Sequence, residues 1–143
     1  MPNHQLTKLS EDLASLIPRF HQKFIHHLHF PIPPNHFFTL VSLYDYGTQT
    51  ITEISSRLLI SKQQMSPIIE KLLKSGYVER QTDPTDKRTA KISITNAGYK
   101  LLENHHITMK NLLEKKLTIL DDTELHELDK TLISFFHLFN KLP

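Results

Sequence analysis

Positively charged side chains gather in one part of the sequence, between Ser61 and Lys91. Seven lysines and arginines and four acidic residues give this stretch a net charge of +3, whereas the whole chain carries +2 at neutral pH. Lysine and arginine neutralise the phosphates of nucleic acids, so a local excess of positive charge is typical of a DNA-binding element. An excess of this size also fits an ordinary solvated surface, so the interpretation depends on the elements that carry it.

Histidine is the other residue type that could do chemistry, with ten copies in the chain. His26 and His29 are three residues apart in a helical stretch, and His105 is a third candidate. Imidazole is a good ligand for zinc and nickel, so these residues could hold a metal ion. We expect solvated histidines on helix surfaces instead, and therefore no metal and no cofactor.

Motifs for catalysis are lacking. The string His126-Glu127 begins like the helical motif of zinc proteases, but Lys130 stands where the second histidine would be. The sequence has no phosphate-binding glycine loop and no nucleophile motif. Without cysteine it forms neither a disulfide nor a thiol sensor. The sequence therefore argues against an enzyme.

A helix carries the first half of the charged stretch. Ser61 and Gln64 have the spacing of a capping box, so a helix is predicted to begin at Lys62. Apolar residues recur every three or four positions, which gives one buried face and one free polar face. These residues are Met65, Ile68, Ile69, Leu72 and Leu73. Gly76 is predicted to end the helix, because glycine adopts the left-handed conformation of a helix C-terminus without strain.

A hairpin is predicted to follow this helix. Two runs rich in β-branched residues, from Tyr77 to Thr82 and from Thr89 to Ile94, flank a turn-rich segment at residues 83–88. The tip of the hairpin carries Lys87 and Arg88. A polar-faced helix that leads into a charged hairpin is typical of a winged helix-turn-helix, in which the helix enters the major groove and the wing touches backbone or minor groove.

The rest of the chain reads as helices. A first helix is predicted from about Leu6 to His29, with a kink or break at Pro18. A second is predicted from Pro34 to Tyr46, ended by Gly47. Its inward-facing residues are predicted to be Phe37, Leu40, Val41 and Tyr44.

Three further helices are marked by their N-caps. Thr50 opens a short third helix that would support the helix-turn-helix, with Ile54 buried. Thr95 opens a fifth helix that extends to about Leu120. Asp121 and Glu124 cap a sixth, whose apolar stripe ends in several phenylalanines.

Length and composition define the class of protein. The chain has 143 residues, the length of one domain, and 38% of them are hydrophobic. No apolar run approaches the about 20 residues that span a bilayer, and the N-terminus has no signal-peptide pattern. We expect a soluble cytoplasmic protein that is mainly α-helical with a small β-hairpin wing.

The predicted hairpin contains an Asp-x-Arg element, Asp86 and Arg88, preceded by Asp83-Pro84. The segment Ile94-Thr95-x-x-Gly98 follows it. With these motifs the stretch from Thr50 to Gly98 resembles the MarR family of bacterial transcriptional regulators, whose wing carries an Asp-x-Arg element after an Asp-Pro and before a Leu-Thr-x-x-Gly. Leu59 stands where the family commonly has a glycine, in the turn before the helix that begins at Lys62.

The resemblance implies which residues contact DNA. The N-terminal half of the fourth helix would read bases through Lys62, Gln63, Gln64 and Ser66, with Pro67 bending the helix. Arg88 would insert into a minor groove, oriented by Asp86, although this pair could instead only brace the hairpin. Arg80 and Lys91 would be phosphate neighbours or wing surface, and Lys87 at the wing tip is a further DNA-binding candidate.

The resemblance also implies an assembly and a signal. Residues 1–33 and 96–143 would form a helical dimerisation region around a winged helix-turn-helix region at 34–95. The protein would bind double-stranded DNA as a homodimer and act as a ligand-responsive repressor on a pseudo-palindromic operator. A small aromatic or phenolic acid would bind between the two regions. The candidate residues are His36, Phe37, Tyr44, Arg19 and Lys23.

Two alternatives stay open at this point. The winged helix could serve protein or RNA contacts rather than duplex DNA. The clustered histidines could instead make the protein a zinc-responsive repressor.

Overall fold

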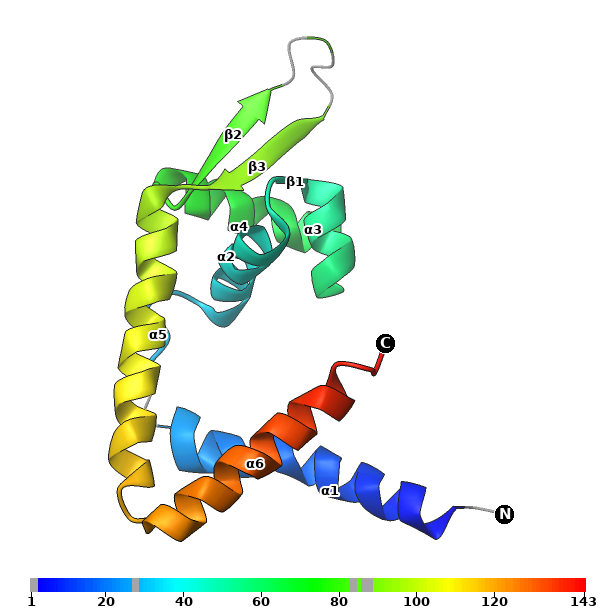
Figure 1. The fold of residues 1–143 in the computed structure, drawn as a ribbon. Coiled ribbons are helices and arrows are strands. Elements are labelled where there is room, and N and C mark those ends of the chain that lie inside the picture. The colour runs from blue at the N-terminus through cyan, green and yellow to red at the C-terminus, as the bar shows by residue number, and fades with distance from the viewer. Residues whose placement is uncertain (1–2, 27–28, 83–84, 86–88) are drawn as a thin grey trace. The chain divides into compact units, whose positions relative to one another are not determined.

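The computed structural model describes residues 3–26, 29–82, 85 and 89–143, and the chain divides into two compact units, Met1–Thr108 and Met109–Pro143. Each unit is described by itself. The elements in chain order are α1 (His4–Phe20), the π-helix η1 (His21–Ile25), α2 (Pro34–Tyr46), β1 (Gln49–Thr50), α3 (Ile51–Leu58), α4 (Lys62–Lys74), β2 (Val78–Thr82), β3 (Ala90–Ile94), α5 (Asn96–Leu117) and α6 (Asp122–Phe139) (Figure 1). The mainly helical winged helix-turn-helix fold predicted from the sequence is confirmed.

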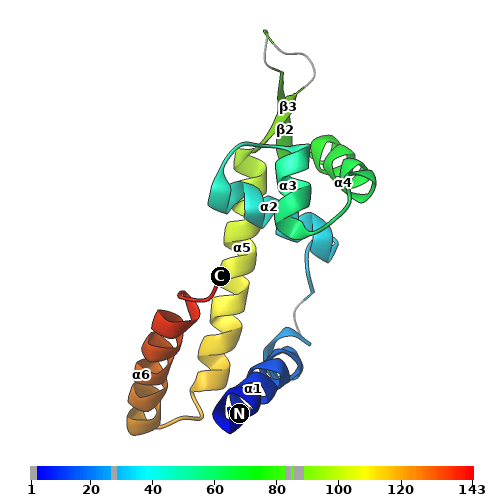
Figure 2. The same ribbon diagram turned by 90° about the vertical axis from the view of Figure 1, so that its right-hand side faces the viewer.

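A small antiparallel sheet lies in the first unit, with strand order β1-β3-β2. Strands β2 and β3 run side by side as the wing, with Val78 opposite Ile94 and Thr82 opposite Ala90 (Figures 1 and 2). The two-residue strand β1 adds to the other edge of β3, where Gln49 lies opposite Ile92. The hairpin prediction is confirmed, whereas the sequence did not predict β1.

One hydrophobic core holds α2, α3, α4 and the sheet together, and we call this part of the chain, residues 34–94, the winged-helix lobe. Its buried apolar side chains are Leu40, Leu43, Ile54, Met65, Ile68, Ile69, Leu72, Val78 and Ile92. Four of them come from α4, so this helix is fixed in the lobe by the apolar face predicted from its sequence.

The start of α5 is held close to the end of α4 and the wing. The hydroxyl of Thr95 donates a hydrogen bond to the Gly76 carbonyl (2.6 Å) and accepts one from the Gly98 amide (3.2 Å). A side chain at Gly98 would collide with the Tyr77 carbonyl oxygen, 2.3 Å from the position of its Cβ atom. Glycine is thus required here by the close approach of two backbones.

The first predicted helix is wrong in its length and regularity. The α-helix ends at Phe20 and continues as a π-helix to Ile25, where the His26 amide bonds to the His21 carbonyl (2.8 Å). Pro18 lies inside α1, and the π-helix begins three residues after it. The α-helix therefore has no break at Pro18 itself.

The predicted inward face of α2 is partly wrong. Phe37 and Leu40 are buried as predicted, but Leu43 takes the place expected for Tyr44, which is exposed and packs against Tyr99 with ring centroids 5.6 Å apart. The buried face also includes Thr39, whose hydroxyl donates to the Asn35 carbonyl (2.7 Å). This internal hydrogen bond lets a polar residue occupy the core side.

The observed ends of the other helices agree more closely with those predicted from the sequence. α2 spans Pro34–Tyr46 as predicted, and Gly47 follows it with a φ of 78°. The capping box of α6 is complete: the Asp121 carboxylate accepts from the Glu124 amide (2.9 Å), and the Glu124 carboxylate accepts from the Asp121 amide (3.0 Å). α5 ends at Leu117, three residues before the predicted end.

Candidate nucleic-acid interface

The first two turns of α4 present the polar residues that the sequence selected for base contacts. Ser61 caps the helix by accepting a hydrogen bond from the Gln64 amide (3.2 Å), so α4 begins at Lys62. Lys62, Gln63 and Gln64 are exposed, while Met65 directly after them is fully buried. The buried face fixes the rotation of the helix about its axis and so fixes which side chains point outward.

Ser66 and Pro67 change the hydrogen bonding of the same turns. The Ser66 hydroxyl donates to the Lys62 carbonyl (3.0 Å), which engages it within the helix. Pro67 has no N–H for the Gln63 carbonyl four residues earlier. Both side chains are exposed. Ser66 is consequently a weaker candidate for a base contact than the two glutamines, because its donor is already used.

The turn between α3 and α4 is formed by a leucine in the left-handed conformation. Leu59 has φ 54° and ψ 38°, and 93% of its surface is exposed. Its amide donates to the Ser55 carbonyl, and the Ile60 amide bonds to the same carbonyl (3.1 Å). A branched side chain in this conformation costs about 1–2 kcal/mol relative to a glycine-type position. The turn therefore forms without its usual glycine, at a cost in strain.

An ion pair connects α4 with the wing. The Arg80 guanidinium on β2 donates to the Glu70 carboxylate on α4 (Nη2 to Oε1, 2.9 Å), and both side chains are partly exposed. Arg80 was predicted as a phosphate contact, and its charge is partly offset by this neighbour. The three wing-tip candidates, Asp86, Lys87 and Arg88, lie outside the described residues.

The predicted ligand residues occupy different environments. Phe37 is buried in an aromatic cluster, which consists of Phe30, Phe37, Phe38 and His105. His36 is half-buried, and burial followed by the charge of Lys71 lowers its pKa, so this imidazole is neutral near pH 7. Arg19 lies in α1 and Lys23 in η1, and both are exposed.

The histidines do not form a metal cluster in the part of the chain that the structure describes. There, no group of three or more histidine, cysteine, aspartate or glutamate side chains is close enough to hold an ion. His105 instead stacks on Phe30, with centroids 5.4 Å apart, and meets Phe37 edge-on at 4.6 Å. Burial, and then the neighbouring His106, lowers the pKa of His105.

A second group of polar residues was missed by the sequence analysis. Arg57 on α3 lies over the Tyr46 ring, 3.8 Å from its centroid, and its Nε donates to the buried Gln49 (3.1 Å). Arg57 was assigned no role from the sequence. Only the separation of eight residues between Gln49 and Arg57 hinted at this contact, and that spacing is not specific.

Residues 32–90 of the chain match the model of the MarR family. Over these residues the chain is similar to proteins of the MarR family. The matched segment contains α2, α3, α4 and β2 and ends at the first residue of β3, so it coincides with the lobe that exposes Lys62, Gln63 and Gln64.

Similar proteins are described as HTH-type transcriptional regulators. The chain is 26% identical over 108 residues to the HTH-type transcriptional regulator YsmB of Bacillus subtilis, covering 76% of this chain and 74% of YsmB. It is 36% identical to the regulator YkoM of the same species over 70 residues, 49% of this chain and 46% of YkoM. The chain thus spans about half the length of YkoM.

A MarR family protein from Bacillus stearothermophilus has the same fold. Its solved structure superposes with a TM-score of 0.74 at 20% identity, covering 99% of each chain. The family and the names of these relatives denote DNA-binding transcriptional regulators, not enzymes. Within the described residues, no helix has both the length and the apolar character needed to cross a membrane.

Proposed function

We propose that this protein is a sequence-specific, ligand-responsive repressor that binds a pseudo-palindromic operator in double-stranded DNA as a homodimer. One observation carries the proposal: α4 exposes Lys62, Gln63 and Gln64 at its N-terminal end while Met65 and Ile69 anchor its opposite face in the core. A helix held this way can enter a major groove without disturbing the lobe. Glutamine can then pair with adenine through two hydrogen bonds, and lysine with guanine or phosphate.

The wing would add backbone and minor-groove contacts. Strands β2 and β3 pair side by side, and the tip, residues 83–88, joins them in the sequence (Figure 2). Within that tip, Arg88 would enter a minor groove with Asp86 orienting its guanidinium, and Lys87 would lie near phosphates.

Dimerisation is supported by apolar stripes that one chain leaves uncovered. None of the described residues of α1 or α6 is buried. On α6, Leu132 is 43% exposed and Phe136 is 53% exposed, and α1 exposes a similar row. The exposed apolar residues of α1 are Leu6, Leu9, Leu13, Leu16, Ile17 and Phe20. Surfaces of this kind are usually covered by another subunit, so residues 1–33 and 96–143 would form the dimerisation region around the winged helix at 34–95.

A small aromatic or phenolic acid would act as the signal at a crevice near the start of α2. Phe37 and Tyr44 would supply apolar walls, and Arg19 or Lys23 would supply the positive charge for a carboxylate. His36 would act as a neutral hydrogen-bonding group, since its pKa is lowered. The ligand would release DNA only through different affinities for DNA-competent and DNA-incompetent forms of the dimer. The protein would act in the cytoplasm without a cofactor.

Selection of bound sequences from a random duplex pool tests the DNA proposal directly. We expect a two-fold-related pair of half-sites to be enriched, with affinity that falls steeply as salt is raised. The same titration with single-stranded and duplex RNA of random sequence is the comparison. Equal affinity for RNA, or no enrichment of any duplex sequence, would favour an RNA- or protein-binding winged helix instead.

A further inference from the structure

One acidic residue lies on the polar side of α4, a helix whose other charged residues are lysines. This residue, Glu70, is followed by no other acid in the helix, and 59% of its side-chain surface is exposed. Seven residues separate it from Gln63, which is almost two full turns of 3.6 residues. Gln63 and Glu70 therefore point to the same side of the helix, opposite the apolar residues that are buried in the core.

Arg80 holds one oxygen of the Glu70 carboxylate and leaves the other open. Its Nη2 on β2 donates to Oε1 of Glu70 (2.9 Å). Among the described residues, no other hydrogen bond or ion pair reaches this carboxylate. An ionised carboxylate has several acceptor sites, so Oε2 can accept from a further donor. The guanidinium also offsets the negative charge that DNA phosphates would repel. The ion pair thus presents a hydrogen-bond acceptor of reduced charge beside Gln63.

The four bases differ in what they offer such an acceptor in the major groove. Cytosine presents its N4 amino group as a donor, whereas guanine presents two acceptors and thymine presents an acceptor and a methyl group. Adenine places its N6 donor beside the N7 acceptor, which suits the amide of glutamine better than a carboxylate. A carboxylate on the groove-facing side of α4 would therefore select cytosine.

We propose that Glu70 is a specificity-determining residue, which accepts a hydrogen bond from the N4 amino group of a cytosine through Oε2 while Arg80 positions it through Oε1. This inference rests on the proposed function, with α4 in the major groove. An α-helix rises about 1.5 Å per residue, so Glu70 lies about 10.5 Å beyond Gln63, close to three base pairs of about 3.4 Å each. The cytosine should thus lie about three base pairs from a base that Gln63 contacts.

Selection of bound sequences from a random duplex pool, with the full chain and three variants, tests this assignment. We expect the wild type to enrich a cytosine at one position of each half-site, and Glu70→Ala to lose the preference at that position alone. Glu70→Gln should prefer adenine there, because an amide both donates and accepts.

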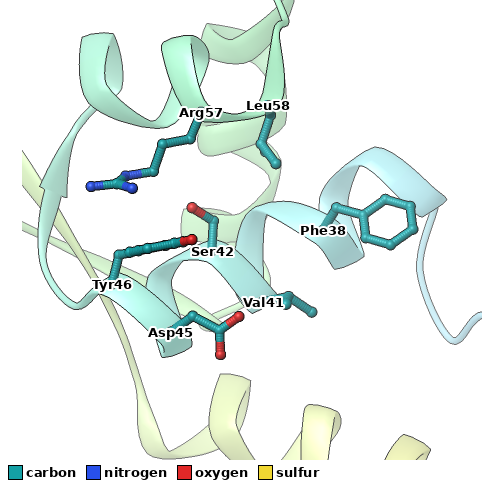
Figure 3. Close-up of a pocket in the computed structure, with 7 residues that line it drawn as sticks. All are labelled: Phe38, Val41, Ser42, Asp45, Tyr46, Arg57 and Leu58. Atoms are coloured by element: carbon teal, nitrogen blue, oxygen red, sulfur yellow. The ribbon is translucent and has the colours of Figure 1, made fainter. Parts of the chain in front are cut away.

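Asp45→Asn is the matched control for the loss of one exposed carboxylate. Asp45 lies on α2, where it borders a cavity lined by residues of α2 and α3 and by none of α4 (Figure 3). This variant should therefore select the same sequences as the wild type.

Binding to one fixed operator measures the size of the contact. Replacing the cytosine by thymine exchanges the N4 donor for the O4 acceptor. This exchange should weaken the wild type about tenfold, as the loss of one charge-assisted hydrogen bond would, and hardly affect Glu70→Ala. Fluorescence anisotropy measures the affinities, and thermal unfolding shows whether each variant is folded.

Two outcomes would overturn the assignment and leave the proposed repressor function standing. In one, Glu70→Ala keeps every base preference of the wild type. In the other, folded Glu70→Ala loses affinity equally for all sequences, as expected if the ion pair only braces α4 against the wing. If the wild type enriches no duplex sequence, the proposed function itself is contradicted, and this inference with it.

Discussion

Glu70 and Arg80 form an ion pair of 2.9 Å that ties α4 to the first strand of the wing. Both side chains are partly exposed, so we expect the pair to stabilise the fold by only about 0.2–1 kcal/mol. Its larger effect should be on DNA binding, because Glu70 offsets a positive charge that would face phosphate in the proposed complex.

Glu70→Gln should therefore tighten binding to random duplex more than Glu79→Gln, which removes an equal charge from β2. The extra gain should disappear when Arg80→Gln is also present, and fluorescence anisotropy at several salt concentrations measures it. If Glu70→Gln and Glu79→Gln change the affinity for duplex equally, both with Arg80 and with Arg80→Gln, then Glu70 does not offset the charge of Arg80.

Substitutions on the exposed side of α4 should distinguish residues that recognise the base sequence from residues that contribute only charge to DNA binding. Gln63→Ala or Gln64→Ala should change the preferred operator sequence while the salt dependence of binding stays constant, since base contacts carry sequence information. Lys62→Ala is the comparison: if it contacts phosphate, it lowers the salt slope by about 1 and keeps the sequence preference. Unchanged preference in both glutamine variants would remove these residues from the proposed interface.

Arg88→Ala should weaken operator binding by about 1–3 kcal/mol without unfolding the protein, if Arg88 makes the proposed minor-groove contact. Calorimetry or anisotropy measures the affinity, and thermal unfolding checks the fold. Arg19→Ala, outside the winged helix, controls for loss of one positive charge. An affinity equal to that of the Arg19 variant at moderate salt would argue that Arg88 only braces the hairpin.

Leu132→Asp should break the proposed homodimer, because it places a charge within the apolar stripe of α6. Its neighbour Thr131 is exposed, and its hydroxyl donates to the Glu127 carbonyl of the same helix (2.8 Å). Thr131→Asp is therefore a matched control that should stay dimeric. Light scattering gives the mass of each variant, and operator binding should weaken together with dimerisation. Two variants of equal mass would contradict an assembly role for this stripe.

Acid should destabilise the aromatic cluster through His105. Its pKa lies below the usual 6.5 in the folded protein, mainly because of burial, so the unfolded chain binds the proton more readily. The free energy of unfolding should consequently decrease as pH falls through 6.5 towards the lowered value.

His105→Phe keeps a ring beside Phe30 and Phe37 but cannot titrate, so it should flatten this dependence. Urea unfolding at about pH 7.5 and 5.5 measures the difference. A pH dependence as steep as that of wild type would assign the effect to other groups.

Helix starts were predictable from sequence because they depend on neighbouring residues. Ser61, Thr50 and Asp121 each accept the hydrogen bond from the amide three residues later, as their spacing predicted. Such bonds form within one turn and need no knowledge of the rest of the fold.

Features that depend on distant parts of the chain were not predictable. The strand β1 exists only because Gln49 and Thr50 meet β3 more than forty residues later. The choice of Leu43 over Tyr44 for the core follows from how α2 rotates against α4, which the periodicity of one helix does not fix. The partners of Arg80 and Arg57 likewise come from other elements, so their types and spacing gave no specific signal.

The buried apolar core of the winged-helix lobe is drawn from residues between Leu40 and Ile92. During synthesis this segment leaves the ribosome before α6 has been made. We therefore expect the lobe to fold on the nascent chain, as domains generally do. At that stage the apolar stripe of α1 would still be exposed. A newly made chain would then contain a folded α4 before it can dimerise and contact two half-sites at once.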